Sequence, residues 1–302
     1  MADLLRPRPS RAARLRVLLT AAGEEKKPLV APGCYDALGA RLIEQAGFDV
    51  VYMTGFGTTA SLLGRPDVGL LGLAEMADNG RRIADAVDLP VIADADTGYG
   101  NPINVVRTVQ TYERAGLAAL HLEDQVLPKK CGHMENKEVV DAGRMVGKIR
   151  AAVAARTDPD FAIIARTDAR APLGMDEALR RAEAFAEAGA DMLFVEALQG
   201  EEEIRTVAEQ LRGFPLLFNW AEGGKTPPLD YATIAELGFA LIIFPIGTLL
   251  AATRAMHGFL ARLKADGTPA AFVQELMAFR AFTDTIGLPE IGALEERFKA
   301  DE

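Results

Sequence analysis

The chain has 302 residues, of which 33 are Lys or Arg and 43 are Asp or Glu, so its formal net charge is −10. Hydrophobic residues make up 49% of it and charged residues 25%, a composition typical of globular proteins, and its length allows two medium domains or one α/β barrel. The acidic balance argues against nucleic acid or a charged membrane surface as a partner, so local cationic groups must bind any anionic substrate.

The N-terminal segment is rich in arginine, and two interpretations are open for it. The arginines are compatible with a transit peptide and stand at Arg6, Arg8, Arg11, Arg14 and Arg16. A helix from about Arg11 to Ala22, N-capped by Ser10 and stopped by Gly23, accounts for the same segment with a cap at both ends. We favour the helix.

Short apolar runs recur along the chain and alternate with segments of helical periodicity. The runs are Leu29–Ala31, Val50–Met53, Val91–Ala93, Ala119–Leu122, Ala162–Ala165, Met192–Val195, Leu216–Phe218 and Leu241–Phe244. Continuously apolar strands are typical of a parallel sheet that is covered on both faces. Eight such strands alternating with helices predict an α/β fold, a (β/α)8 TIM barrel.

No change of composition marks a domain boundary, so we expect one barrel domain over residues 1–302. The N-terminal helix lies within residues 1–27, the barrel spans 28–269, and residues 270–302 form a C-terminal helical extension. Eight β/α units do not require this extension, and we expect its helices to pack outside the barrel or on a neighbouring subunit. The longest apolar run is too short and too broken to span a bilayer, and the two cysteines provide no disulfide framework. We expect a cytoplasmic protein without a membrane partner.

Polar residues gather where the apolar runs end. In a (β/α)8 barrel the chemistry lies at the carboxyl ends of the strands. The residues at these ends are Thr54-Gly55, Asp94-Ala95-Asp96, Glu123-Asp124-Gln125, Arg166-Thr167-Asp168, Glu196 and Asn219. Solvated charges placed at random would not cluster at one end of so many strands, so we expect the functional site here.

Asp94, Asp96 and Glu123 lie on neighbouring predicted strands at one level of the barrel. Close carboxylates repel each other unless a cation or protons intervene. Oxygen ligands without a nearby His pair favour Mg²⁺, or Mn²⁺ as a substitute, over zinc. Asp67, in the predicted loop Gly64–Gly69, is a further carboxylate that reaches toward the metal. The alternative is a layer of salt bridges with Arg166 and no metal.

Arg166 offers a bidentate fork to a substrate carboxylate. Neutralising Glu123 or Glu196 is its alternative role, and the two roles are compatible. His121, within the fourth predicted strand, is expected to be a hydrogen-bonded interior group beside the acid cluster.

The loop after the fourth predicted strand, Gln125–His133, carries the most informative pattern. Cys131 stands beside two lysines and two residues from His133, and this positive potential is predicted to lower the thiol pKa and favour thiolate. The flanking Pro128 and Gly132 suit a loop that closes over the barrel mouth. We therefore predict a functional role for Cys131 and a buried, inert Cys34.

The segment Gly55–Ala60 matches the pattern G-x-G-x-x-A of dinucleotide-binding proteins. Such a site needs a helix that begins at the glycines, whereas the chain continues into the predicted loop Gly64–Gly69. We therefore expect no dinucleotide site.

Several stretches, in this order, resemble the isocitrate lyase/phosphoenolpyruvate mutase superfamily. They are Leu63–Gly69, Asp94–Gly100, His121–Gln125, Lys129–His133, Ala165–Ala169 and Phe194–Ala197. The resemblance implies a barrel whose last helix is exchanged between the subunits of a homodimer or homotetramer. It also implies Mg²⁺ held by Asp94 and Asp96, with Asp67 and Glu123 in its outer shell. The implied substrate contacts are Thr54, Gly55, Phe56, Cys131, Gly132, His133, Arg166, Glu196 and Asn219.

Within this superfamily the Cys loop is typical of carbon–carbon lyases. The resemblance implies Mg²⁺-dependent cleavage of a small anionic 2-hydroxy (alkyl)dicarboxylate into a 2-oxo acid and a carboxylic acid. In this reaction Cys131 is the general acid, and Tyr52 is the candidate for the hydroxyl proton transfer. A purely buried aromatic is the alternative role of Tyr52.

The substrate is open between several candidates. Methylisocitrate lyases have a Thr and an Arg where this chain has Ala221 and Leu250, and a third buried carboxylate would then lack a partner. The segment Glu222–Pro227 is similar instead to 2,3-dimethylmalate lyase-like proteins, a group that includes oxaloacetate-cleaving enzymes. Carboxyvinyl-carboxyphosphonate phosphorylmutase, a phosphonate enzyme, shares both this segment and the Cys loop. A non-catalytic ligand-binding barrel is the remaining alternative.

Overall fold

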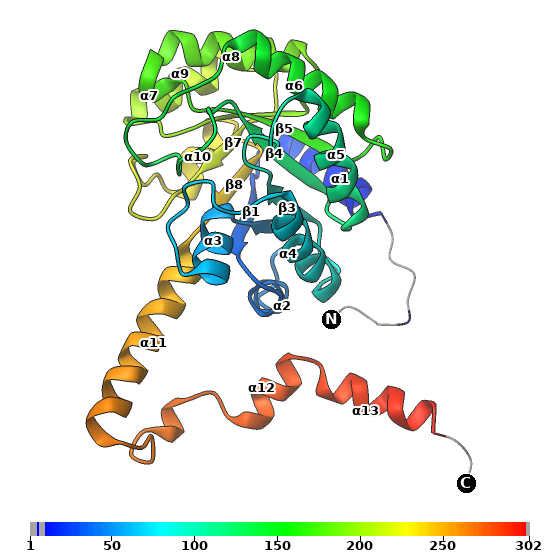
Figure 1. Cartoon of the computed structure of the whole chain (residues 1–302), viewed down its shortest axis with the longest axis vertical. Coiled ribbons are helices and arrows are strands. Elements are labelled where there is room, and N and C mark those ends of the chain that lie inside the picture. The colour runs from blue at the N-terminus through cyan, green and yellow to red at the C-terminus, as the bar shows by residue number, and fades with distance from the viewer. Residues whose placement is uncertain (1–4, 6–9, 300–302) are drawn as a thin grey trace.

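Eight parallel strands form a nearly closed barrel in this computed structural model, which describes residue 5 and residues 10–299 (Figure 1). Along the sheet the order is β6-β5-β4-β3-β2-β1-β8-β7. The strands are β1 Leu29–Cys34, β2 Val51–Met53, β3 Val91–Asp94, β4 Ala119–Glu123, β5 Ala162–Thr167, β6 Met192–Val195, β7 Leu217–Asn219 and β8 Leu241–Phe244. Each lies on a predicted apolar run, so the predicted α/β barrel is confirmed.

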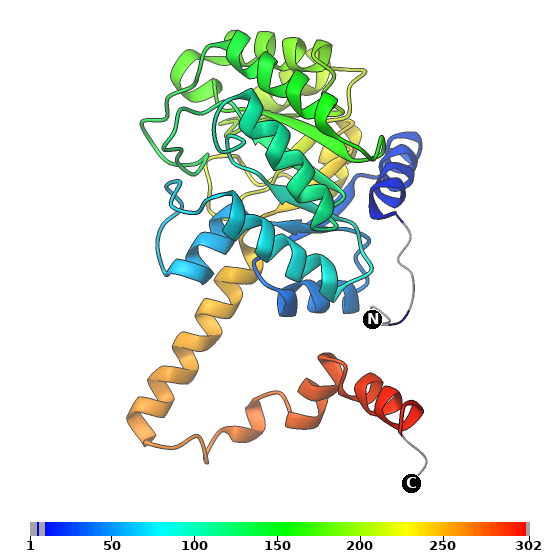
Figure 2. The ribbon, with the colours of Figure 1, turned by 45° about the vertical axis from the view of Figure 1, so that its right-hand side comes forward.

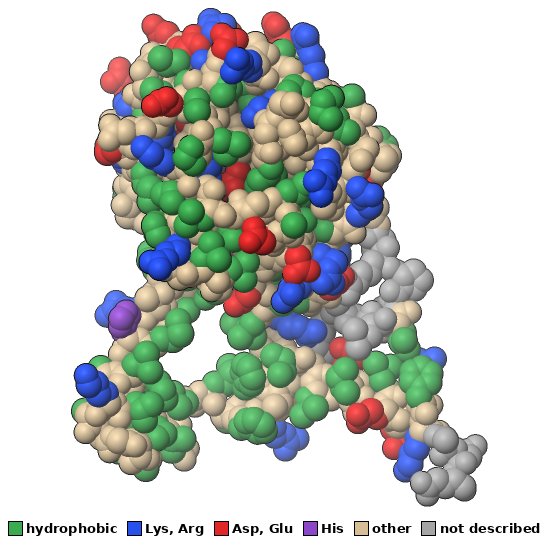
Figure 3. All heavy atoms as spheres, viewed as in Figure 1, with side chains coloured by type: hydrophobic (Ala, Val, Ile, Leu, Met, Phe, Trp, Pro, Cys, Tyr) green, Lys and Arg blue, Asp and Glu red, His purple; other side chains and the backbone are tan. Residues whose placement is uncertain are grey.

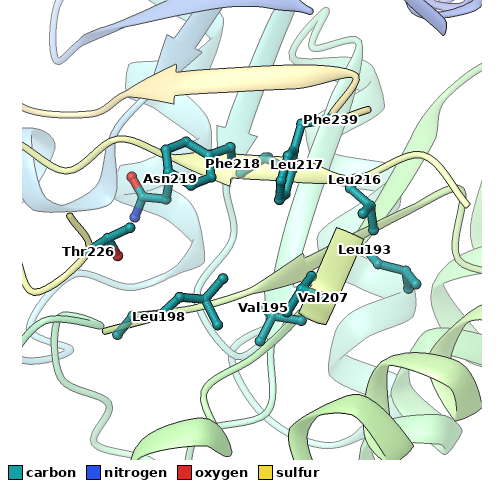
Figure 4. A pocket seen from close by; sticks show the side chains of 11 residues that line it. Leu193, Val195, Leu198, Val207, Leu216, Leu217, Phe218, Asn219, Thr226 and Phe239 are labelled. Atoms are coloured by element: carbon teal, nitrogen blue, oxygen red, sulfur yellow. The ribbon is translucent and has the colours of Figure 1, made fainter. Parts of the chain in front are cut away.

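The ring is weakest between β6 and β7, which share only an isolated parallel bridge, Leu193 to Leu216. A cavity of about 10 Å³ lies at this seam and is lined almost entirely by aliphatic and aromatic side chains (Figure 4). A space of this size holds at most one water molecule. The seam is therefore a packing feature of the barrel and not a ligand site.

Helices surround the barrel and connect successive strands (Figure 2). They are α2 Ala37–Gln45, α3 Gly55–Leu63, α4 Leu73–Ala86, α5 Pro102–Arg114, α6 Ala142–Ala155, α7 Arg170–Leu173, α8 Met175–Glu187, α9 Glu201–Gln210 and α10 Tyr231–Glu236. Helix α11 Gly247–Asp266 follows the last strand, β8. The apolar side chains of the strands point either toward these helices or into the barrel, as two separate buried clusters show. This packing on both faces explains why the strands are continuously apolar.

The N-terminal helix α1, Arg11–Glu25, begins as predicted, with the Ser10 side chain accepting a hydrogen bond from the Ala13 amide. Its predicted end at Gly23 is wrong, because Lys26 adopts the left-handed conformation (φ 53°) and donates its amide to the Ala22 carbonyl. The helix packs on the barrel through Leu15, which is fully buried with the inward-facing strand residues. Arg6 and Arg8 lie outside the described residues.

The expectation that no helix begins at the Gly55–Ala60 pattern is also wrong. Helix α3 starts at Gly55, and the Thr54 hydroxyl caps it by accepting a hydrogen bond from the Gly57 amide at 3.2 Å. The sequence signal for this helix is weak, because its capping residue, Thr54, is an extended residue directly after β2. The eight-stranded barrel order nevertheless differs from the open doubly wound sheet of dinucleotide-binding proteins.

The C-terminal arm, which comprises α11 and the elements after it, leaves the barrel. A short 3-10 helix (Val273–Glu275), α12 Phe279–Thr285 and α13 Leu288–Arg297 follow α11, and none of these four elements contains a buried residue. The arm carries a largely apolar surface that includes Phe279, 82% exposed (Figure 3). Within the described part of the chain, no helix is long and apolar enough to cross a membrane.

Candidate active site

A cavity of about 220 Å³ opens at the carboxyl ends of the strands. Most of the predicted site residues line it: Tyr52, Thr54, Phe56, Asp67, Asp94, Cys131, Gly132, His133, Arg166, Glu196 and Asn219. Gly55, Asp96 and Glu123 do not line the cavity but lie buried behind it. The structure thus brings six strands, β2 to β7, and the loops that follow them to one place.

Asp94, at the end of β3, is the carboxylate most closely fitted to its surroundings. Its Oδ1 accepts a hydrogen bond from the Asp96 amide at 2.9 Å. A Cβ atom on Gly55 would lie only 2.4 Å from Asp94 Oδ2, so glycine is needed for this approach. Burial disfavours the charged form of Asp94, but the charges facing it, those of Lys129 and Arg166 among them, outweigh burial and lower its pKa.

Tyr52 and His121 form a buried pair next to Asp94. The Tyr52 hydroxyl and His121 Nε2 are 2.8 Å apart, and His121 Nε2 is 3.6 Å from Asp94 Oδ1. Burial lowers the pKa of His121 to about 4, so the imidazole is neutral, and burial raises the pKa of Tyr52 well above its usual value. His121 is therefore the predicted hydrogen-bonded interior group, and the neutral Tyr52 hydroxyl lies at the cavity wall.

Lys129 joins two of the predicted metal-binding carboxylates. Its Nζ lies 2.7 Å from Asp67 Oδ2 and 2.6 Å from Asp96 Oδ1, and its side chain is almost fully buried. The desolvation of the ammonium is outweighed by the surrounding carboxylates, so the pKa of Lys129 is raised well above its usual value. Burial raises the pKa of Asp96 to about 7 in spite of this lysine. Lys129 thus provides part of the positive charge that we had expected from a metal.

Glu123, at the end of β4, is the least satisfied of these carboxylates. Neither of its oxygens has a hydrogen-bond partner among the described residues, and Arg166 Nη1 is 3.3 Å from Oε2. Burial raises the pKa of Glu123 well above its usual value.

The carboxylates of the site fit a Mg²⁺ ion that is bound by one or two of them and otherwise by water and substrate. Among the described residues, no three His, Cys, Asp or Glu side chains converge closely enough to form a complete metal site. Mg²⁺ commonly takes one or two carboxylates and fills its remaining positions with water and substrate oxygens. Asp94 lines the cavity, and the unsatisfied oxygens of Glu123 lie behind it. An all-oxygen set of this kind suits Mg²⁺ or Mn²⁺ rather than zinc.

Arg166 is held by three carboxylates. It donates to Asp168 through Nε at 2.9 Å and Nη2 at 3.0 Å, and Nη2 lies 3.4 Å from Glu196 Oε2. The sequence indicated the ion pairs with Glu123 and Glu196, but not the fork that Asp168 occupies. Because Nη1 faces Glu123, all three guanidinium nitrogens already face a carboxylate, and a substrate carboxylate has to share one of them. Burial opposes the charged form of Glu196, but Arg166 and His133 outweigh burial and lower its pKa.

Cys131 lies in the loop between β4 and α6, which we call the Cys131 loop (residues 125–140). Its amide donates to the Asp67 carbonyl at 3.1 Å, and the residue lines the cavity. The predicted depression of the thiol pKa is wrong, because burial raises the pKa of Cys131 to about 11. Lys129 is engaged with Asp67 and Asp96, and Lys130 donates to the Asn136 carbonyl at 2.8 Å. The thiol is therefore protonated at neutral pH, the form that a proton donor requires. Cys34 is fully buried, as predicted.

The loop after β7 closes the cavity against the Cys131 loop. His133 Nδ1 accepts a hydrogen bond from the Lys225 amide at 3.0 Å, and its Nε2 lies 3.4 Å from Asn219 Nδ2. Lys225 also pairs with Glu135. Ala221 and Glu222 line the cavity from the same loop. The first three residues of the segment Glu222–Pro227 are thus part of the cavity wall.

Sequence reasoning missed three polar groups of the site. Lys129 was assigned to the thiol and not to the carboxylates, and Asp168 was noted only as a strand end. Lys137 was not singled out, although its side chain is 1% exposed and contacts Asp168 at 2.7 Å. Lys137 follows the pair Lys129-Lys130 by seven residues in a polar loop. No sequence pattern there distinguishes a buried lysine from one that is exposed to solvent.

The chain is similar to known proteins over almost its whole length. The family model described as phosphoenolpyruvate phosphomutase matches residues 19–264. The 2,3-dimethylmalate lyase of Eubacterium barkeri is 49% identical over 287 residues, which cover 95% of this chain and 98% of that protein. A probable 2-methylisocitrate lyase 1 of Corynebacterium glutamicum is 47% identical over 237 residues, covering 78% of this chain and 77% of that protein.

Solved structures of proteins from the same superfamily are also similar to this chain. A crystal structure of 2,3-dimethylmalate lyase, a PEP mutase/isocitrate lyase superfamily member, is 42% identical, covers 96% of both chains and gives a TM-score of 0.90. A phosphonopyruvate hydrolase in complex with oxalate and Mg²⁺ is 33% identical, with a TM-score of 0.87 over 96% of this chain and 99% of that chain.

Proposed function

We propose that this chain, which belongs to the phosphoenolpyruvate phosphomutase family within the PEP mutase/isocitrate lyase superfamily, is a carbon–carbon lyase that cleaves a 2-hydroxy dicarboxylate. Its products are a 2-oxo acid and a carboxylic acid. The observation that carries the proposal is a protonated, half-buried Cys131 thiol at the wall of a small cavity that also holds Arg166 and Asp94.

Mg²⁺ is the cofactor that we propose for this site, with Mn²⁺ as a substitute. Asp94 would hold it at the cavity wall, assisted by Asp67 from the same wall and by Asp96 and Glu123 from behind the cavity. A bound divalent cation supplies Lewis-acid stabilisation of the negative charge on the 2-hydroxyl oxygen and its neighbouring carboxylate. The phosphonopyruvate hydrolase complex with oxalate and Mg²⁺ supports the same cofactor class in the superfamily.

The protein residues account for binding and for both proton transfers. Arg166 binds a substrate carboxylate. The Tyr52 hydroxyl takes the proton of the 2-hydroxyl as it passes its own proton to Nε2 of the neutral His121, to which it is hydrogen-bonded. The C2–C3 bond then breaks, and its electron pair remains on C3 next to the second carboxylate. Cys131 gives its thiol proton to C3 as general acid. The oxygen on C2 becomes the carbonyl of the 2-oxo acid, and C3 becomes part of the carboxylic acid.

We propose a branched dicarboxylate such as 2,3-dimethylmalate as the first substrate, and 2-methylisocitrate as the second. Phe56, Ala221, Pro245 and Ile246 give the cavity an apolar side that suits alkyl groups. The cations that line the cavity, Lys129 and Arg166, already pair with buried carboxylates. A third substrate carboxylate would therefore lack a free cation, and its burial without a partner is costly.

We propose that the protein is a homo-oligomer, either a tetramer or a dimer, and the C-terminal arm supports this proposal. An apolar groove of about 650 Å³ lies between α2 and the base of α11, and the arm extends away from it with no residue of α11 buried (Figure 1). A second copy's arm has the apolar surface that would fill this groove. We propose that the last barrel helix is exchanged between subunits in this way.

The experiment that tests the function compares 2-oxo acid release from 2,3-dimethylmalate, 2-methylisocitrate, isocitrate and oxaloacetate with Mg²⁺, side by side with phosphonopyruvate. We expect pyruvate from 2,3-dimethylmalate at the highest kcat/KM. Turnover mainly of 2-methylisocitrate would contradict the argument from the missing cation. Turnover of phosphonopyruvate that survives in Cys131→Ala, without turnover of any hydroxy acid, would replace the lyase by the phosphonate alternative.

A further inference from the structure

Lys137 is a buried cation that the proposed chemistry does not use. It lies on the returning limb of the Cys131 loop, and its side chain is 1% exposed. Burial of an ammonium group is costly unless several partners compensate for it. Its partners are therefore informative about what this lysine does.

The Lys137 ammonium joins two parts of the site. It donates to the carbonyl of Gly132, the residue next to Cys131, and to Asp168 Oδ1 at 2.7 Å. The same carboxylate accepts both hydrogen bonds from Arg166. One carboxylate directly after β5 thus connects the backbone beside the thiol to the guanidinium that binds substrate.

Asp168 is itself fixed by the barrel. Its amide donates to Asp124 Oδ1 at 2.8 Å, and Asp124 Oδ2 accepts from Arg181 at 2.9 Å. Burial opposes the charged form of Asp168, but Arg166 and Lys137 outweigh burial and lower its pKa, so this carboxylate is an anion. The partner of Lys137 is therefore an immobile anchor.

The tip of the Cys131 loop, residues 131–134, is tightly packed against Arg166 and Glu196. A Cβ atom on Gly132 would lie 2.5 Å from both Arg166 Nη2 and Glu196 Cγ. The base of the loop is held independently by backbone hydrogen bonds from the Val126 amide to the Glu138 carbonyl and from the Val140 amide to the Asp124 carbonyl. The tip and the base are thus fastened by different interactions.

We propose that Lys137 is a positioning residue that fastens the tip of the Cys131 loop to the Asp168–Arg166 pair, so that thiol and guanidinium are held in one arrangement. The kinetic part of its test rests on the proposed function, whereas the hydrogen-exchange part does not. A misplacement of about 1 Å at a reacting group costs about 100-fold in rate, which sets the scale of the expected effect.

The test compares Lys137→Met with Lys130→Met. Lys130 is a matched control because it lies in the same loop and also donates to a backbone carbonyl, but it is exposed to solvent at that contact. In Lys137→Met we expect amide hydrogen exchange at Cys131 and Met134 to rise by about tenfold or more, because these tip amides open locally. Exchange at Val126 and Val140 should stay unchanged, and Lys130→Met should resemble the wild type at all four amides.

On the best hydroxy acid substrate, we expect kcat of Lys137→Met to fall about 100-fold while KM changes less, because Asp168 still holds Arg166. Unchanged exchange at the tip, or an equal rise at the base, would overturn the proposal even if no substrate is turned over. A rise in KM with an unchanged kcat would also overturn it. If Lys137→Met does not fold, Lys137→Gln carries the same test, and wild-type exchange at its tip amides would contradict the proposal.

Discussion

Gly55→Ala tests the geometry on which the site depends. The added methyl group would lie 2.4 Å from Asp94 Oδ2 and 2.9 Å from Asp94 Cγ. Ordinary van der Waals contact begins near 3.4 Å, so either Asp94 or the start of α3 must move by about 1 Å. Asp94 is tethered by the Asp96 amide, and α3 is capped by Thr54, so neither moves freely.

We expect this substitution to lower the free energy of unfolding by about 1–3 kcal/mol, the usual cost of adding volume to a packed site. The displacement of Asp94 should lower kcat/KM about 100-fold and raise the Mg²⁺ concentration needed for half-maximal activity. Urea denaturation measures the first effect, and 2-oxo acid release during a Mg²⁺ titration measures the second.

Gly23→Ala is the matched control, because Gly23 lies inside α1 and no atom lies within 4 Å of its Cβ position. Alanine is the better helix former, so this variant should gain about 0.5–1 kcal/mol and keep full activity. Wild-type stability and an unchanged Mg²⁺ titration in Gly55→Ala would refute the close approach of Asp94 and its metal-binding role together.

Three further predictions follow from the same site. Cys131→Ser should keep the fold and Mg²⁺ binding but lose at least about 100-fold in 2-oxo acid release, and near-wild-type turnover would exclude the general acid. Because only the protonated thiol donates, and burial raises its pKa to about 11, kcat should stay level through pH 9 and fall near 11; an alkaline limb near 9 in the pH–rate profile would contradict this. Asp94→Ala should abolish Mg²⁺-dependent turnover, whereas an activity with an unchanged Mg²⁺ titration would exclude Asp94 as a ligand.

The barrel could be predicted from the sequence because each of its strands and helices produces a pattern within a few neighbouring residues. A strand buried on both faces must be continuously apolar, and a helix must be capped, so each element leaves a mark within a few residues. The error at Gly23 arose because a glycine tolerates a helix interior as well as a stop, and Lys26 took the left-handed position instead. The helix at Gly55 was missed for a similar local reason, since Thr54 is a cap that looks like an ordinary strand end.

The site residues were predicted where the chain order of polar strand ends was enough to place them. The carboxyl ends of neighbouring strands meet in a barrel, so Asp94, Cys131 and Arg166 were expected together, and all three line one cavity. What the sequence alone determined was therefore which side chains share that end of the barrel.

Only the tertiary structure decided how these charges are paired. The pKa of Cys131 depends on burial and on where each lysine side chain ends, and Lys129 ends on Asp67 and Asp96 instead of the thiol. The role of Lys137 likewise depends on Asp168, which lies 31 residues further along the chain and 2.7 Å away in space. Ion pairing and desolvation act over a few ångströms between distant segments, so no local pattern can specify them.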